Sequence, residues 1–117
     1  PYPDAVNDAE REYFESQGLT VTADEGLVLF KAQERLRHMN LVREDDVEAL
    51  AEKIDSPEAE AVFLSCADLA TLGVIDTLEK KLGKPVISSV QATFWGSLRA
   101  AGIEDRIEGC GRLLAAH

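Results

Sequence analysis

Short apolar runs alternate with longer helical segments in the second half of this chain, and this order limits the possible fold more than any other feature. Residues 61–65 and 84–89 are rich in Val, Ile, Leu and Ser, as expected for short strands buried within a sheet. Residues 69–82 carry apolar side chains at helical spacing, with Asp68 as a candidate N-cap and Gly83 as a stop. This strand–helix–strand order predicts a parallel sheet joined by right-handed crossovers, and therefore an α/β fold.

The remaining segments continue the alternation less clearly. Helical periodicity predicts further helices over residues 4–17, 41–54 and 91–101. Asp4 is a candidate N-cap and Gly18 a candidate stop for the first of them, and residues 19–23 alternate in period two, which predicts a short strand. Residues 24–40 show no clear pattern, and we interpret their basic island as a solvated helix face formed by Lys31, Arg35, Arg37 and His38.

Three candidate strands are few for a sheet that is covered on both faces. The opening Pro1-Tyr2-Pro3-Asp4 is turn-forming sequence of the kind that follows a strand. We therefore expect a further strand of the same sheet to lie outside these 117 residues.

Size, charge and cysteine content exclude several classes of function. A length of 117 residues suits one domain, residues 1–117. The net charge of −10 disfavours binding to nucleic acid or to an anionic membrane, and no apolar run reaches the length of a membrane span. Cys66 and Cys110 are far apart and form no metal-binding motif with the two histidines, so neither a metal nor a disulfide framework is expected. We expect a reducing, cytoplasmic location.

Cys66 lies at the junction between a predicted strand and a predicted helix, where it could take part in catalysis. It follows the strand at 61–65 and would precede the helix at 69–82, and ligands of open α/β sheets bind at the carboxyl ends of strands. Free N–H groups at a helix start favour a thiolate, and the same amides could hold an anion. A solvent-accessible thiol here could act as nucleophile or proton donor without a cofactor. The alternatives are that Cys66 only packs in the core and that Asp68 only caps the helix.

Five segments resemble the maleate isomerase and arylmalonate decarboxylase group of the aspartate/glutamate racemase superfamily. The cysteine segment 62–75 and the downstream segments 78–89 and 92–95 look like the C-terminal half of these enzymes. The opening residues 1–7 resemble their tyrosine-bearing segment, and residues 111–114 resemble their C-terminal end. The resemblance implies a flavodoxin-like parallel sheet flanked by helices, one of two pseudo-symmetric lobes with the active site between them.

The same resemblance assigns roles to individual residues. Cys66 would be the catalytic cysteine of the second lobe, and Tyr2 would donate a hydrogen bond to a substrate carboxylate or enediolate oxygen. Asn7 would orient the substrate, and the backbone amides of Ala67 and Asp68 would complete an oxyanion cradle. The first lobe is not in this chain, and a neutral residue often stands where this chain has Asp68, so a dicarboxylate substrate would meet a negative charge there.

The resemblance implies a cofactor-independent, cysteine-dependent isomerase of a small dicarboxylate, similar to maleate cis–trans isomerase. An amino-acid or hydantoin racemase and an arylmalonate-type decarboxylase are alternatives within the superfamily. A lobe without catalysis, serving as a flavodoxin-like binding or oligomerisation module, is the alternative outside it. The expected partners are a dicarboxylate substrate and the missing N-terminal lobe, and two copies of the chain could also associate.

Overall fold

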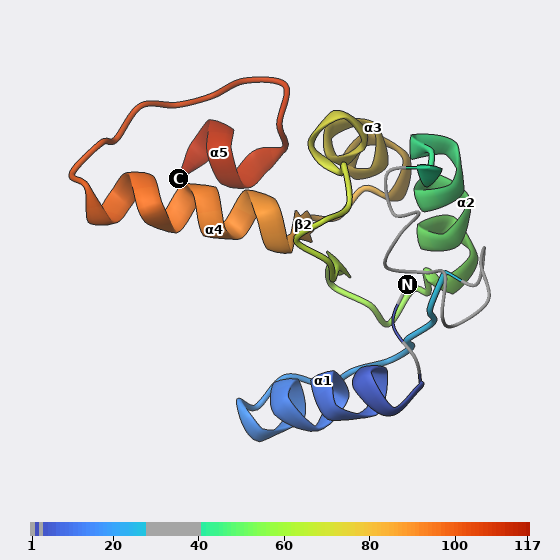
Figure 1. Cartoon of the computed structure of the whole chain (residues 1–117). Helices are drawn as coiled ribbons and strands as arrows, with labels where there is room; N and C mark the ends of the chain where they lie inside the picture. The colour runs from blue at the N-terminus through green and yellow to red at the C-terminus, as the bar shows by residue number, and fades with distance from the viewer. Residues whose placement is uncertain (1, 3, 28–40) are drawn as a thin grey trace.

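The computed structural model describes residue 2, residues 4–27 and residues 41–117. The basic island and any helix within residues 31–39 lie outside the described residues. The described elements follow the order α1 (Asp4–Ser16), α2 (Glu44–Ile54), β1 (Val62–Leu64), α3 (Leu72–Leu82), β2 (Val86–Ser88), α4 (Ser89–Ala100) and α5 (Arg112–Ala116) (Figure 1).

The two strands form a parallel sheet, as the strand–helix–strand order predicts. Val62 lies opposite Val86 in the register, and the backbone N–H of Val62 donates to the carbonyl of Pro85 at 2.9 Å. Helix α3 provides the crossover, and its apolar stripe is fully buried at Ile75 and Leu78. Helix α2 packs against α3 and contributes Val47 and Ala51 to the same core, so the prediction of an α/β fold is confirmed.

Residues 19–23 do not form a strand, so this prediction is wrong. A strand is stable only when a neighbouring strand satisfies its backbone groups, and no strand of the described residues pairs with this segment. Side-chain contacts hold it to α1 instead. Arg11 donates from Nη1 to the carbonyl of Val21 at 3.1 Å and forms an ion pair with Asp24.

Helix α3 begins three residues later than the sequence predicts, at Leu72 rather than Leu69. Thr71 occupies the N-cap position, so the prediction that Asp68 caps this helix is wrong. Residues 67–69 form a turn between β1 and α3. The other end follows the prediction, because Gly83 adopts a φ of 71° and its N–H donates to the carbonyl of Glu79.

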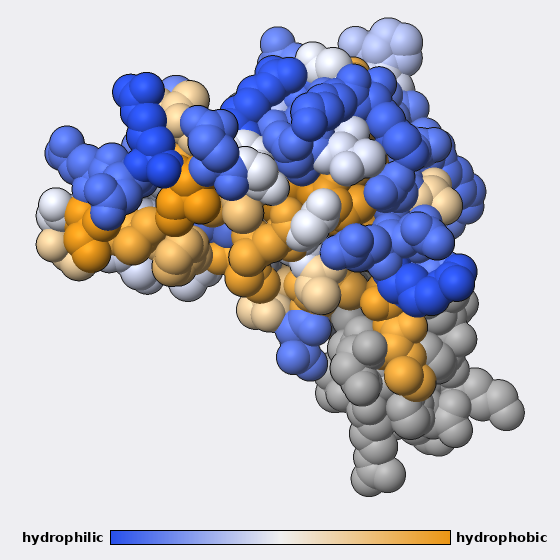
Figure 2. Space-filling model, turned by 90° about the horizontal axis from the view of Figure 1, so that it is seen from above, coloured by the Kyte–Doolittle hydropathy of each residue, from blue (hydrophilic) through white to orange (hydrophobic). Residues whose placement is uncertain are grey.

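Two parts of the chain extend from the central layers (Figure 1). Helix α1 contributes no buried residue and lies on one side of the sheet. Helices α4 and α5 form an arm on another side, joined to the core through β2. Figure 2 shows apolar side chains gathered along one face of the molecule, and Phe94 and Ile103 are among the exposed large hydrophobic residues.

The carboxylate of Glu79 anchors the C-terminal arm. Glu79 is 4% exposed, and its Oε1 accepts the N–H of Val86 at 3.2 Å while Oε2 accepts the N–H of Arg112 at 2.9 Å. Gln91, which is fully buried, donates from Nε2 to the carbonyl of Cys110 at 2.6 Å. Glu79 thus connects the start of β2 to the first residue of α5, and Gln91 connects the start of α4 to the loop before α5.

Candidate active site

Cys66 lies two residues beyond the end of β1, at the carboxyl edge of the sheet where ligands of α/β proteins bind. Its side chain is buried, at 4% exposure, within the same apolar cluster as Val62, Leu69 and Val74. The expectation of a solvent-accessible sulfur is therefore wrong for this chain. The reason is that Cys66 and Leu69 both pack into the core, on either side of the exposed turn residues 67 and 68, whereas the sequence predicts that a helix begins at residue 69.

Tyr2 lies against this thiol. The phenol O–H of Tyr2 donates a hydrogen bond to the Cys66 side chain, and Tyr2 packs on the buried cluster that contains the cysteine. Burial raises the pKa of Tyr2 to about 12, with further contributions from the hydrogen bond to Cys66 and from the nearby charges of Glu10 and Asp68. The phenol therefore remains protonated throughout the neutral pH range, as a hydrogen-bond donor must.

The amides that follow Cys66 belong to a turn. Ala67 and Asp68 are exposed, and within the described ranges no recorded hydrogen bond uses the backbone N–H of either residue. The start of α3 is separated from Cys66 by residues 67–71, so the helix dipole does not act directly on the thiol.

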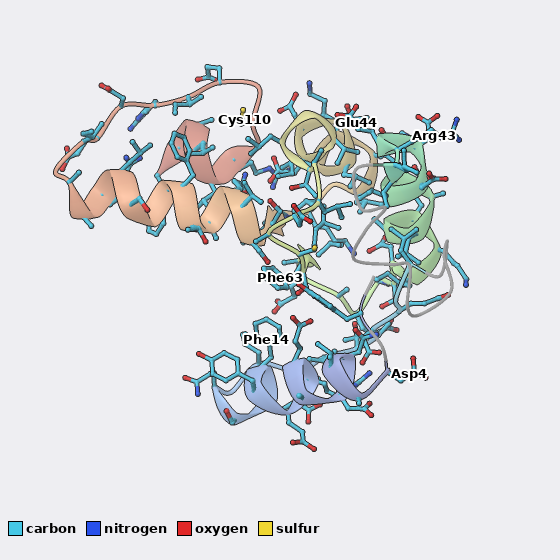
Figure 3. The ribbon with its side chains drawn as sticks, in the orientation of Figure 1. Asp4, Phe14, Arg43, Glu44, Phe63 and Cys110 are labelled. Atoms are coloured by element: carbon cyan, nitrogen blue, oxygen red, sulfur yellow. The ribbon has the colours of Figure 1, made fainter. Side chains whose placement is uncertain are left out.

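A carboxylate of the chain itself already faces the start of α3. A Cβ added to Gly73 would lie 2.3 Å from Oε1 of Glu44, so the Glu44 carboxylate packs closely against the first turn of the helix. Figure 3 shows Glu44 on α2, on the side of α3. The Glu44 carboxylate thus occupies the positive end of the α3 dipole. The backbone amides that remain to bind an anion near Cys66 are those of the turn residues Ala67 and Asp68.

Glu10 and Ser65 belong to the site, and neither was identified from the sequence. Ser65 donates from Oγ to Oε1 of Glu10 at 2.5 Å, joining α1 to the end of β1. A signal was present, because Glu10 lies four residues after Val6 and four before Phe14, on the apolar stripe of α1. A carboxylate on an apolar helix face usually has a partner, and here that partner is Ser65.

An apolar groove separates α1 from β1. Its volume is about 370 Å³, and it is lined by Val6, Ala9, Glu10, Tyr13, Phe14, Phe63, Ser65 and Ser89. The rings of Phe14 and Phe63 make an edge-to-face contact across it, with centroids 5.3 Å apart. In Figure 3 the labelled side chains of Phe14 and Phe63 extend toward each other from the helix and the strand.

Asn7 is half-buried and lies beside Gly26. A Cβ added to Gly26 would meet the carbonyl oxygen of Tyr2 at 3.0 Å and Nδ2 of Asn7 at 3.3 Å. Asn7 is thus close to the backbone of Tyr2, but no recorded contact of the described residues joins it to Cys66. The structure brings Tyr2 and Cys66 into direct contact, whereas Asn7 lies near the backbone of Tyr2 and further from Cys66.

The charges near Tyr2 are negative. Glu10 and Asp68 both act on its phenol, and none of the ion pairs among the described residues involves either carboxylate. An anionic substrate would therefore depend on neutral donors, which here are the Tyr2 phenol and the turn amides. In the described part of the chain no three metal-ligating side chains cluster together, and no helix is long and apolar enough to cross a membrane.

Comparisons with known proteins agree on one group of enzymes. The arylmalonate decarboxylase family model matches residues 1–114. An arylmalonate decarboxylase from Bordetella bronchiseptica is 45% identical over 47 residues, which are 40% of this chain and 20% of that protein. A maleate isomerase from Nocardia farcinica is 27% identical over 115 residues, 97% of this chain and 44% of that protein.

A solved structure from the same group of enzymes has the same fold. The crystal structure of an arylmalonate decarboxylase superposes with a TM-score of 0.86 at 30% identity, over 97% of this chain and 49% of that one. This chain therefore spans half or less of the length of the relatives it matches.

Proposed function

Because this chain belongs to the arylmalonate decarboxylase family, we propose that it forms the second lobe of a cofactor-independent enzyme in which Cys66 attacks a small dicarboxylate. The observation that carries the proposal is the hydrogen bond between Tyr2 and Cys66 at the carboxyl end of β1. It joins a potential nucleophile to a donor that stays protonated, at the edge of the sheet where α/β enzymes bind their ligands.

The proposed reaction is the cis–trans isomerisation of maleate. The Cys66 thiolate adds to one alkene carbon, and the electron pair of the double bond moves onto the adjacent carbon and its carboxylate as an enediolate. Rotation about the resulting single bond and expulsion of the thiolate restore the double bond as fumarate. Tyr2 and the amides of Ala67 and Asp68 would donate hydrogen bonds to the developing oxyanion, and Asn7 would orient the substrate.

The missing half of the site would come from a first lobe. The chain spans 44% of the maleate isomerase from Nocardia farcinica, and its own site presents two carboxylates, Glu10 and Asp68, near the phenol. A dicarboxylate needs further donors or cations besides the Tyr2 phenol and the turn amides. A first lobe closing over Cys66 would provide them and would exclude water from the enediolate.

The two cysteines of the chain allow a matched test. Residues 1–117 are joined to the first lobe of the Nocardia farcinica maleate isomerase, and formation of fumarate from maleate is followed by proton NMR. We expect Cys66→Ala to reduce turnover by at least about a thousandfold, because loss of a nucleophile is the largest single effect in covalent catalysis. Cys110→Ala, with circular dichroism to verify folding of both variants, should retain turnover; equal activities of the two variants would remove Cys66 from the mechanism.

Decarboxylation is a second candidate, and a specific similarity favours it. The 47 residues shared with the Bordetella bronchiseptica arylmalonate decarboxylase have 45% identity, well above the 27% shared with the maleate isomerase over a longer range. In that reaction CO₂ leaves with its bond electrons remaining as an enediolate, and the Cys66 thiol donates a proton to the carbon. Release of CO₂ from phenylmalonate by the same fusion, without fumarate formation from maleate, would select this candidate.

A further inference from the structure

Two hydrogen bonds join the beginning of the chain to the residues that follow β1. The phenol of Tyr2 donates to the side chain of Cys66. The hydroxyl of the preceding residue, Ser65, donates to Oε1 of Glu10 at 2.5 Å. Tyr2 and Glu10 belong to one short stretch of chain, and Ser65 and Cys66 are neighbours. The same two segments are therefore attached at two points, one of which contains the candidate nucleophile.

Helix α1 is a rigid link between the two attachment points. It begins at Asp4, just after Tyr2, and Glu10 lies about 9 Å further along the helix axis. The hydrogen bonds within the helix keep this spacing, so a shift of Glu10 away from β1 also moves Tyr2. No residue of α1 is buried, so its position depends on contacts at the surface. The ring contact of Phe14 with Phe63 holds the far end of the helix (Figure 3), whereas the bond of Glu10 lies nearer to Tyr2.

The carboxylate of Glu10 needs its partner. It is half-buried and borders the groove of about 370 Å³, whose lining is mostly apolar. None of the ion pairs among the described residues involves Glu10, so a hydrogen bond must offset its lost hydration. A hydroxyl that donates to a carboxylate forms a shorter and stronger bond than neutral groups do. The carboxylate therefore favours the position of α1 in which Ser65 is within reach.

We propose that Glu10 is a positioning residue: its bond to Ser65 fixes α1 against the end of β1 and thereby aligns the Tyr2 phenol with the Cys66 thiol. As a statement about catalysis, the inference rests on the proposed function, in which the phenol and the thiol act on one substrate. The alignment itself is a property of this chain, and it can be measured without substrate.

Both members of the aligned pair can be observed in one background. With Tyr13→Phe and Cys110→Ser, Tyr2 is the remaining tyrosine and Cys66 the remaining cysteine. Near-ultraviolet absorbance follows ionisation of the phenol, and the rate of reaction with a disulfide reagent reports access to the thiol. Burial raises the pKa of Tyr2 to about 12, and the hydrogen bond to Cys66 adds to this effect. Loss of the alignment should therefore lower the midpoint of the Tyr2 titration.

Two variants break the bond, and each has a matched control. Ser65→Ala removes the donor and keeps the charge of Glu10. Its control is Ser97→Ala, because the Ser97 hydroxyl donates to the carbonyl of Thr93 within α4. Glu10→Ala removes the acceptor, whereas Glu10→Gln removes the charge but keeps an oxygen that can accept from Ser65. Circular dichroism verifies folding, and either of the two breaking variants is sufficient for the test.

The breaking variants should change both readouts. We expect Ser65→Ala to lower the Tyr2 midpoint by at least about 0.5 pH units and to speed labelling of Cys66 by at least about fivefold. Glu10→Ala should have the same two effects, and Ser97→Ala should have neither. Glu10→Gln should lower the midpoint only through the lost charge and should keep the slow labelling of the parent chain.

Either of two results would overturn the proposal. If Ser65→Ala keeps the midpoint and the labelling rate of the parent chain, the bond does not align the pair. If Glu10→Gln speeds labelling of Cys66 as much as Glu10→Ala does, the charge of the carboxylate acts on the site and its bond to Ser65 does not. Neither readout requires turnover, so an inactive fusion enzyme would refute the proposed isomerisation and leave this inference standing.

Discussion

The phenol of Tyr2 donates a hydrogen bond to the side chain of Cys66, joining the start of the chain to the turn that follows β1. The contact joins a buried thiol to a phenol whose pKa is raised. Neither residue is close to the other in sequence, and the pairing results from the return of the chain to the carboxyl edge of the sheet.

The titration of Tyr2 should be displaced upward. In a Tyr13→Phe background Tyr2 is the remaining tyrosine, and its ionisation can be followed by near-ultraviolet absorbance. We expect a midpoint near pH 12 in the folded chain, because burial and the bond to Cys66 favour the protonated phenol, and a midpoint near 10 in denaturant. Asp68→Asn should lower the folded midpoint, since the Asp68 charge raises it; Asp45→Asn, on α2, is the control.

The same displacement predicts a loss of stability at high pH. The folded-state pKa of Tyr2 lies above its unfolded value, so its contribution is fully present below about pH 10 and is lost as pH rises toward about 12. Urea unfolding at several pH values should show this decline in the Tyr13→Phe chain and a weaker decline when Tyr2→Phe is added. An identical decline in both chains would contradict the assignment.

The two cysteines should differ in accessibility. Cys66 is 4% exposed, whereas Cys110 is only partly buried in the loop before α5. In the isolated chain we expect a disulfide reagent to label Cys66, measured in a Cys110→Ser variant, roughly ten times or more slowly than Cys110 in a Cys66→Ser variant, because reaction requires local opening. Both should react at similar rates in denaturant. Fast labelling of native Cys66 would mean that the turn after β1 is open in solution.

The carboxylate of Glu79 should be important for stability. Glu79→Gln retains the size of the side chain but replaces one acceptor with a donor, which must then face the N–H of Val86 or of Arg112. We expect a loss of about 1–3 kcal/mol in the free energy of unfolding, measured in urea. Asp76→Asn on the same helix removes only an exposed pair with Lys80 and should change stability by less than about 0.5 kcal/mol.

Substitutions at two glycines separate the effect of backbone conformation from that of steric overlap with a neighbouring side chain. Gly102 has a φ of 73° and nothing within 4 Å of an added Cβ, so Gly102→Ala should cost about 1–2 kcal/mol from backbone strain alone. Gly111 has a φ of 82°, but a Cβ there would lie 2.3 Å from Cγ2 of Ile75. Gly111→Ala should therefore lose a further 1–3 kcal/mol or so in thermal or urea unfolding, through overpacking. Equal losses would mean that the loop before α5 moves away from the core freely.

Local signals in the sequence predict helices α1 to α4 and the two central strands, whereas the short helix α5 is not predicted. The stripe of α3, the left-handed stop at Gly83 and the Val/Ile content of β2 each depend on residues that are neighbours along the chain. Such features were predicted within a few residues of their observed positions. The position of Cys66 after a strand was predicted for the same reason.

Tertiary structure alone decided three other features. Residues 19–23 have strand-like sequence but no partner strand, and pairing is a property of two segments rather than one. Burial of Cys66 depends on where α3 begins, and the place of Glu10 in the site depends on how α1 lies over β1. Local sequence determines the period of an element and some of its ends, such as the stop at Gly83, whereas the exposure and partners of a side chain depend on packing between distant segments.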